Sequence, residues 1–224
     1  MNDISADLLL HAYAQGYFPM AKSAHDEEIF WFYPEQRGII PLADFHVPRS
    51  LARFLKKSPF TYTTNRCFTD VITACAQRRN TWINRPILNL YTQLHEMGHA
   101  HSVECWQRPD DTSAAARVSL EQIPMAKSAD FAGERYILVG GLYGVALGGA
   151  FFGESMFSHA PNASKAALVH LVELLRGAGY MLLDAQYVNE HLKQFGVIEI
   201  SRAAYLEMLE EALVKKTSSC FEMP

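Results

Sequence analysis

Residues 136–157, YILVGGLYGVALGGAFFGESMF, decide the fold of this protein. The stretch carries no charged side chain before Glu154 and contains two pairs of adjacent glycines. Short apolar runs bounded by turn residues are typical of buried strands, and the pair Gly148–Gly149 divides this stretch into two such strands joined by a tight hairpin. We expect this hairpin to form the middle of a core sheet.

Helices and further strands are predicted on both sides of the hairpin. Apolar residues at helical spacing, with Ser5 and Asn84 as N-caps, predict helices at 4–16 and 85–98. Further helices are predicted at 48–57, 67–77, 162–179, 189–196 and 202–216, and strands at 37–42, 60–64, 100–106, 180–186 and 197–201.

This order of elements indicates an α+β fold in which helices pack on a mixed sheet. We expect a small N-terminal lobe at 1–98 and the sheet domain at 99–224. Residues 107–134 break every periodicity and are predicted to form a long surface loop.

The composition is that of a folded cytosolic protein. Its 224 residues suffice for one medium domain with or without a small lobe, and 49% hydrophobic against 20% charged residues excludes a disordered chain. No stretch approaches the ~18 apolar residues of a membrane span. The N-terminus carries acids where a signal peptide has basic residues, so we expect a cytoplasmic location and no membrane partner. The four cysteines lack a CxxC pair and are expected to be reduced.

Charge is distributed unevenly along the chain. Between Phe45 and His95 there are eight basic residues and one acid, a balance of +7. Because the net charge of the whole chain is −4, the rest of the chain has a balance of −11. A basic face on an otherwise acidic protein favours nucleic acid or a phosphate-rich ligand, although solvated helix faces would give the same pattern. The candidate phosphate-contacting residues are Arg49, Arg53, Lys56, Arg78, Arg79 and Arg85.

Polar side chains at the ends of two buried strands form the candidate site. Glu154 ends one apolar strand, where an acid is either a paired structural group or one held for use. Asp184 and Gln186 end another strand in LLDAQ, and their spacing places them on the same face of it. If the two strands are neighbours, these residues converge on an apolar pocket, which is typical of a small-molecule site.

Other chemistries find little support. Ser155 lies in GESMF, which misses the GxSxG pattern of hydrolases at its last position, and the glycines match neither GxGxxG nor a Walker loop. His99, His101 and Glu104 could begin a metal site, but a third convincing ligand is lacking, and we expect no metal.

Several long motifs resemble one family of bacterial enzymes. HEMGHAHSVECW, LVGGLYGVALGGAFFGESMFS, NASKAAL and LLDAQYVNEHL, together with AYAQGYFPM, FHVPRSLARF and TWIN, resemble the leucyl/phenylalanyl-tRNA–protein transferases over nearly the whole chain. The resemblance implies a C-terminal lobe similar to acetyltransferases. It also implies transfer of leucine or phenylalanine, possibly including methionine among its donors, from aminoacyl-tRNA to the N-terminal amine of proteins that begin with Arg or Lys, which marks them for degradation.

The resemblance further implies roles for individual residues. Asp184 would orient Gln186, whose amide oxygen would hold the attacking amine or relay its proton. Glu154 would help to bind the basic N-terminal side chain or the amine. Because the donor ester is already activated, the reaction requires no cofactor, ATP or metal. The residues expected to bind substrate are Trp82, Leu142, Phe151, Ser158, Asn189 and Met20. The candidate phosphate-contacting residues of the basic segment would contact the acceptor arm of the tRNA. Met20 and Ser158 lie in motifs where this chain departs from many members, which have tryptophan after FP and SR after MF.

Two alternatives stay open at this point. A coenzyme A-dependent N-acyltransferase would share the C-terminal fold, but no pyrophosphate-binding turn precedes NASK. A non-catalytic tRNA-binding module would leave Glu154, Asp184 and Gln186 unexplained.

Overall fold

The computed structural model describes residues 4–78, 80–109, 127–131 and 133–221. Its helices are α1 (Ala6–Ala14), α2 (Arg49–Leu55), α3 (Phe68–Ala76), α4 (Arg85–Glu96), α5 (Ala163–Ala178), α6 (Glu190–Lys193) and α7 (Arg202–Leu213). Its strands are β1 (Phe18–Met20), β2 (Phe30–Phe32), β3 (Gln36–Ile40), β4 (Thr61–Thr64), β5 (Ala100–Gln107), β6 (Ser128–Phe131), β7 (Glu134–Leu147), β8 (Ala150–Ser158), β9 (Leu182–Gln186) and β10 (Ile198–Ser201).

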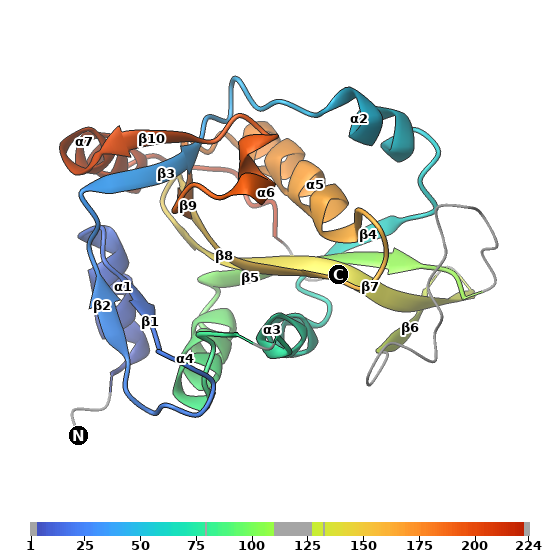
Figure 1. Cartoon of the computed structure of the whole chain (residues 1–224), viewed down its shortest axis with the longest axis horizontal. Helices are drawn as coiled ribbons and strands as arrows, with labels where there is room; N and C mark the ends of the chain where they lie inside the picture. The colour runs from blue at the N-terminus through green and yellow to red at the C-terminus, as the bar shows by residue number, and fades with distance from the viewer. Residues whose placement is uncertain (1–3, 79, 110–126, 132, 222–224) are drawn as a thin grey trace.

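A mixed sheet forms the centre of the molecule, which confirms the predicted α+β class. Among the described residues it has eight strands in the order β10-β3-β9-β8-β7-β5-β4, with β6 paired to β7. The pair β8–β9 is parallel and the other neighbours are antiparallel. A second, two-stranded sheet, β1–β2, lies beside α1 at the edge of the molecule (Figure 1).

The predicted glycine hairpin is confirmed at the centre of this sheet. β7 and β8 pair from Leu147↔Ala150 to Gly140↔Ser158. Gly148 has φ +57, and a Cβ atom there would lie 2.4 Å from the Leu213 carbonyl oxygen. Glycine is therefore required at this turn both by its backbone conformation and by the close approach of the end of α7.

Helices cover both faces of the sheet (Figure 1). One apolar cluster joins α1, α3, α4 and α7 to one face, and a second joins α5, α2 and α6 to the other. The predicted caps help to define these helices, since Ser5 accepts a hydrogen bond from the Leu8 amide at 3.1 Å and Asn84 from the Ile87 amide at 2.8 Å.

Two expectations about chain organisation are wrong. β3 and β4 come from the segment predicted as the N-terminal lobe, yet both are hydrogen-bonded within the main sheet. A division at residue 98 therefore cuts through that sheet, and the part that stands outside it is the α1–β1–β2 unit. The predicted loop at 107–134 also contains β6, which forms a hairpin with β7; residues 110–126 lie outside the described part.

Local packing accounts for the cysteines and for His101. All four cysteines are free, and Cys67 and Cys75 are buried core residues. His101 stacks on Phe221 and contacts the Asn65 amide, which makes it a structural residue. None of the described helices has the length and hydropathy needed to cross a membrane.

Candidate active site

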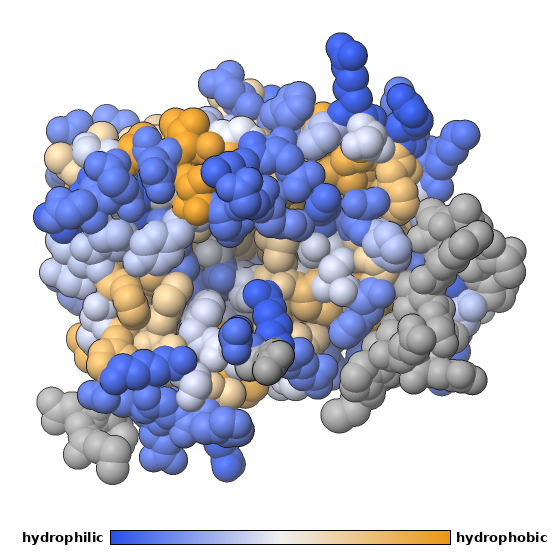
Figure 2. Space-filling view, in the orientation of Figure 1, coloured by the Kyte–Doolittle hydropathy of each residue, from blue (hydrophilic) through white to orange (hydrophobic). Residues whose placement is uncertain are grey.

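The site lies where β8 and β9 stop pairing. Their parallel ladder runs only from Ala150↔Leu182 to Phe152↔Asp184, although β8 continues to Ser158. The strands therefore separate beyond this point and leave a cavity of about 840 Å³ between them. In the space-filling view the surface is hollowed near its centre, between α5 and α6 on one side and α3 and α4 on the other (Figure 2).

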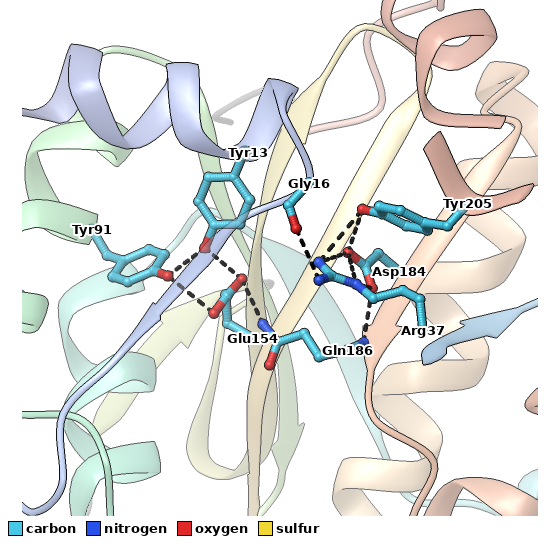
Figure 3. Close-up of polar contacts among 8 residues, drawn as sticks. All are labelled: Tyr13, Gly16, Arg37, Tyr91, Glu154, Asp184, Gln186 and Tyr205. Atoms are coloured by element: carbon cyan, nitrogen blue, oxygen red, sulfur yellow. Dashed lines mark hydrogen bonds and ion pairs between the residues drawn. The ribbon is translucent and has the colours of Figure 1, made fainter. Parts of the chain in front are cut away.

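A bulge in β8 sets the direction of Glu154. Gly144 pairs with Gly153, but the preceding residue Tyr143 pairs with Ser155, so Glu154 is an extra residue without a partner on β7. Bulges bend a strand locally and redirect a side chain, and they are frequent beside active sites. Glu154 is consequently aimed at α1 and α4, and not along the regular alternation of β8 (Figure 3).

A second bulge sets the position of Gln186. Ile39 pairs with Asp184 and Gly38 with Gln186, which leaves Ala185 as the extra residue on β9. Gln186 has φ +62, a left-handed conformation that residues other than glycine seldom adopt. Its side-chain amide donates to Glu154 Oε1 at 3.1 Å (Figure 3). The predicted convergence of these two strand ends is thus confirmed by direct contact.

Glu154 is enclosed by hydrogen-bond donors. The Tyr13 hydroxyl donates to Oε1 at 2.6 Å, the Tyr91 hydroxyl lies 3.0 Å from Oε2, and the two tyrosine hydroxyls also contact each other. Burial raises the pKa of Glu154 to about 7 because the tyrosine and Gln186 hydrogen bonds offset only part of the desolvation, and the charge of Asp184 adds to the rise. Near neutral pH this carboxyl can therefore exchange a proton with a bound group.

Gln186 presents its other end to the cavity. Because its amide nitrogen is held by Glu154, the amide oxygen lies on the opposite side of the group (Figure 3). Within the described residues this oxygen has no hydrogen-bond donor, and Gln186 is part of the cavity wall. The arrangement offers a fixed acceptor for an N–H group of a ligand.

Asp184 contacts the main chain of Gln186, whereas an orienting role suggests a contact between the two side chains. Its Oδ1 accepts from the main-chain N–H of Gln186 at 2.8 Å, and the Gln186 side chain makes its contact with Glu154. Asp184 is otherwise paired with Arg37 at 2.5 Å, and both side chains are buried. Asp184 thus acts on Gln186 through the backbone.

Most of the predicted substrate-binding residues line the cavity, and one does not. Met20, Trp82 and Leu142 contribute apolar wall. Phe151 is fully buried on the face covered by α5, where its ring stacks on Phe221 at 5.5 Å, and it is not part of the wall. The prediction for Phe151 is wrong because its place one residue before the end of the β8–β9 ladder commits it to the core.

Ser158 and Asn189 line the cavity while serving local structure. Ser158 Oγ donates to the Ala160 carbonyl oxygen at 2.8 Å and accepts from the Ser164 amide at 3.2 Å, which fixes the turn into α5. The Asn189 side chain caps α6 by accepting from the Leu192 amide at 2.9 Å. These bonds account for both residue types without a substrate.

The candidate phosphate-contacting residues fall into two groups. Arg49, Arg53 and Lys56 are exposed on α2 and at its end, on the face covered by α5. Arg78 and Arg85 follow α3 and begin α4 on the opposite face, and Arg79 lies outside the described residues. Arg78 donates to Ser155 Oγ at 2.8 Å and to the Met156 carbonyl oxygen, and it lines the cavity. The basic segment is therefore not one continuous face.

Sequence reasoning missed the residues that support Glu154 and Asp184. Tyr13, Tyr91 and Tyr205 occupy apolar positions of helices, where nothing but a hydroxyl in need of a partner distinguishes them from ordinary core. Arg37 carried a clearer signal, since a charge within an apolar strand requires a buried partner.

Tyr143, in the cavity wall, has a buried hydroxyl without a hydrogen-bond partner among the described residues.

Within the described ranges there is no cluster of three or more His, Cys, Asp or Glu side chains placed to bind a metal ion.

Comparison with known proteins identifies the family. The profile described as Leucyl/phenylalanyl-tRNA protein transferase matches residues 39–128 and 110–210, and the profile of the N-terminal domain of that protein matches residues 2–35, ending before β3. Three bacterial proteins named leucyl/phenylalanyl-tRNA–protein transferase are similar over nearly their whole length. The relative from Paramagnetospirillum magneticum is 50% identical over 96% of this chain and 92% of its own.

The other two relatives agree with it. The protein of Phenylobacterium zucineum is 50% identical over 95% of this chain and 86% of its own, and that of Rhodopseudomonas palustris is 48% identical over 97% and 86%. Among solved structures, the crystal structure of FemX aligns with a TM-score of 0.51 at 13% identity, covering 87% of this chain and 66% of the FemX chain, a likeness of fold alone. By its profile matches and its relatives, this chain belongs to the leucyl/phenylalanyl-tRNA–protein transferase family.

Proposed function

We propose that this protein transfers leucine or phenylalanine from aminoacyl-tRNA to the N-terminal α-amino group of proteins, in the cavity between β8 and β9. The observation that carries the proposal is the contact of Glu154 with Gln186 at the point where the strands separate, with Trp82 and Leu142 in the same cavity. The proposed setting is the cytoplasm, and the proposed acceptors begin with Arg or Lys.

The apolar part of the cavity suits the donor amino acid. Leucine and phenylalanine share only size and hydrophobicity, so a pocket that accepts both has apolar walls and few polar groups. Met20, Trp82 and Leu142 supply such a wall, and Leu168 and Leu171 of α5 extend it. The ester carbonyl would then lie toward the polar groups at the strand ends.

Gln186 and Glu154 would handle the attacking amine. The nitrogen forms a bond to the ester carbonyl carbon and loses one proton, and the ribose oxygen leaves and gains one. The Gln186 amide oxygen would accept a hydrogen bond from an N–H group of the amine and so orient the nitrogen lone pair toward the ester. Glu154, whose pKa burial raises to about 7, would take up the proton near neutral pH.

Glu190 would contact a basic side chain of the acceptor. Three acidic residues line the cavity as described: Glu154, which accepts from two tyrosines and Gln186; Asp184, which is paired with Arg37; and Glu190. Glu190 is 87% exposed and bonded only to Lys193 on its own helix. Exposed pairs of this kind contribute little to stability, so an incoming guanidinium could replace Lys193.

One assay tests the reaction. The protein is incubated with radiolabelled Leu-tRNA, and separately with labelled acetyl-coenzyme A, each with peptides that begin with Arg, Lys, Asp or Ala. We expect transfer from Leu-tRNA to the Arg and Lys peptides. Label transferred only from acetyl-coenzyme A would reject the proposal, and tRNA binding without transfer would indicate a binding module.

A further inference from the structure

The Arg37 side chain is held at the centre of a buried network. It is 2% exposed on β3, and its Nε donates to Asp184 Oδ1 at 2.9 Å while Nη2 donates to Oδ2 at 2.5 Å. Its Nη1 donates to the Gly16 carbonyl oxygen at 3.0 Å, directly after α1 (Figure 3). The guanidinium also lies over the rings of Phe18 and Tyr205, at 4.4 and 4.6 Å from their centroids. A planar, bidentate group is therefore required here, which lysine cannot replace.

Arg37, together with Gln186 and Tyr205, occupies the hydrogen-bond acceptor positions of the Asp184 carboxylate. Its Oδ1 accepts from Arg37 Nε and from the Gln186 amide, and its Oδ2 accepts from Arg37 Nη2 and from the Tyr205 hydroxyl at 2.8 Å. A carboxylate has about four acceptor positions, so little capacity is left for a proton from substrate. Burial by itself lowers the pKa of Arg37, but the charge and hydrogen bonds of Asp184 raise it above its ordinary value, which keeps the guanidinium charged.

The filled carboxylate determines the conformation of Gln186. That residue has φ +62, a strained conformation that persists only where the surroundings fix it. The bond from its N–H to Asp184 supplies such a restraint. Arg37 also holds Gly16 at the end of α1, and α1 carries Tyr13, which binds Glu154. Arg37 is thus connected to both halves of the site.

We propose that Arg37 is a positioning residue for aminoacyl transfer, which fixes the Gln186 main chain through Asp184, and that Asp184 is an ionic anchor and not a proton acceptor. The inference rests on the proposed function, since it assigns how Gln186 is held for that reaction. It predicts that the charge of Asp184 matters only because Arg37 is charged.

A double-mutant cycle tests this dependence. Arg37→Met and Asp184→Asn each leave one buried group without its partner, and each is expected to lower kcat about 100-fold, the effect of misplacing a reacting group by about 1 Å, with little change in the KM for Leu-tRNA. In the double variant the asparagine oxygen can accept from the Gln186 amide and its nitrogen can donate to Tyr205. We expect kcat to recover at least tenfold over either single variant.

The other outcomes separate the alternatives. If Asp184 accepts a proton, the double variant stays as inactive as Asp184→Asn, which overturns the inference. Circular dichroism measures the folded fraction of each variant, and a kcat that matches the wild type once corrected for that fraction would reduce Arg37 to a folding role and also overturn it. Arg37→Lys, which keeps the charge and is expected to fold, should also have a lower kcat. A wild-type kcat in this variant would contradict the positioning role of Arg37.

Two controls complete the design. Arg202 is likewise paired with an acid, Glu35 at 2.7 Å, and lies over Tyr33, but it has no contact with Asp184 or Gln186 among the described residues, so Arg202→Met should leave kcat unchanged. The wild-type protein reports on the proposed function itself. A wild type without transfer rejects that function, whereas an active wild type with no recovery in the double variant rejects only the role of Arg37.

Discussion

Replacement of Glu154 by glutamine should change how the stability of the protein depends on pH. Burial raises the pKa of Glu154 from its ordinary 4.5 to about 7. Between these values the folded protein holds a proton that the unfolded chain has released, so the stability contributed by this group is full below pH 4.5 and is lost as the pH rises through 7. The separation of the two values corresponds to on the order of 3 kcal/mol.

The glutamine variant lacks this titration but can keep the hydrogen bonds. Its amide oxygen can accept from Tyr13 and Gln186, which both donate to Oε1, and its nitrogen can donate to the Tyr91 oxygen. We therefore expect variant and wild type to have similar free energies of unfolding near pH 5. At pH 8.5 the variant should be more stable by about 2–3 kcal/mol, and its transfer rate should be lower by about 100-fold, because the proton acceptor is lost.

Urea unfolding followed by tryptophan fluorescence at pH 5, 7 and 8.5 measures the effect. Glu190→Gln serves as the matched control, since it makes the same change at an exposed acid. A difference between wild type and Glu154→Gln that is equal at pH 5 and 8.5 would refute the reasoning, because it would mean that the carboxyl has the same pKa in the folded and unfolded chains.

Three further changes test the remaining features. Arg53→Glu on α2 should weaken Leu-tRNA binding and reduce the slope of log K against log salt by about 1–2 in filter-binding assays, and an unchanged slope would remove α2 from the tRNA contact. Leu142→Ala enlarges the apolar part of the cavity. It should lower kcat/KM for leucine about 10-fold or more, with a smaller loss for phenylalanine, in competition between the two charged tRNAs. Tyr143→Phe removes a buried hydroxyl without a described partner and should raise the free energy of unfolding by about 1 kcal/mol; a lower value in urea titrations would reveal a bond to that hydroxyl.

The parts of the fold that sequence predicted are those set by neighbouring residues. The β7–β8 hairpin follows from an apolar run and a glycine pair, and the caps Ser5 and Asn84 act on amides three residues away. The addition of β3 and β4 to the main sheet was not predicted, because pairing of β3 with β9 depends on residues far along the chain. A local sequence pattern predicts that a strand forms, but it does not predict which strand pairs with it.

The site shows the same division more sharply. Glu154, Asp184 and Gln186 could be selected because polar residues at the ends of apolar strands need an explanation. Their partners could not, since Tyr13 is 141 residues from Glu154 and Arg37 is 147 from Asp184. The bulges that aim Glu154 and Gln186 were also beyond prediction, because a bulge is a property of two paired strands and not of one.

The choice between a functional and a structural Glu154 has no single answer in this structure. The tyrosines that satisfy its buried oxygens also keep it beside Gln186 at the edge of the cavity. The burial that requires these partners raises its pKa into the range where a carboxyl can accept a proton from an amine at neutral pH. The support of Glu154 and its reactivity therefore have one cause, and a mutation of Tyr13 or Tyr91 should alter both together.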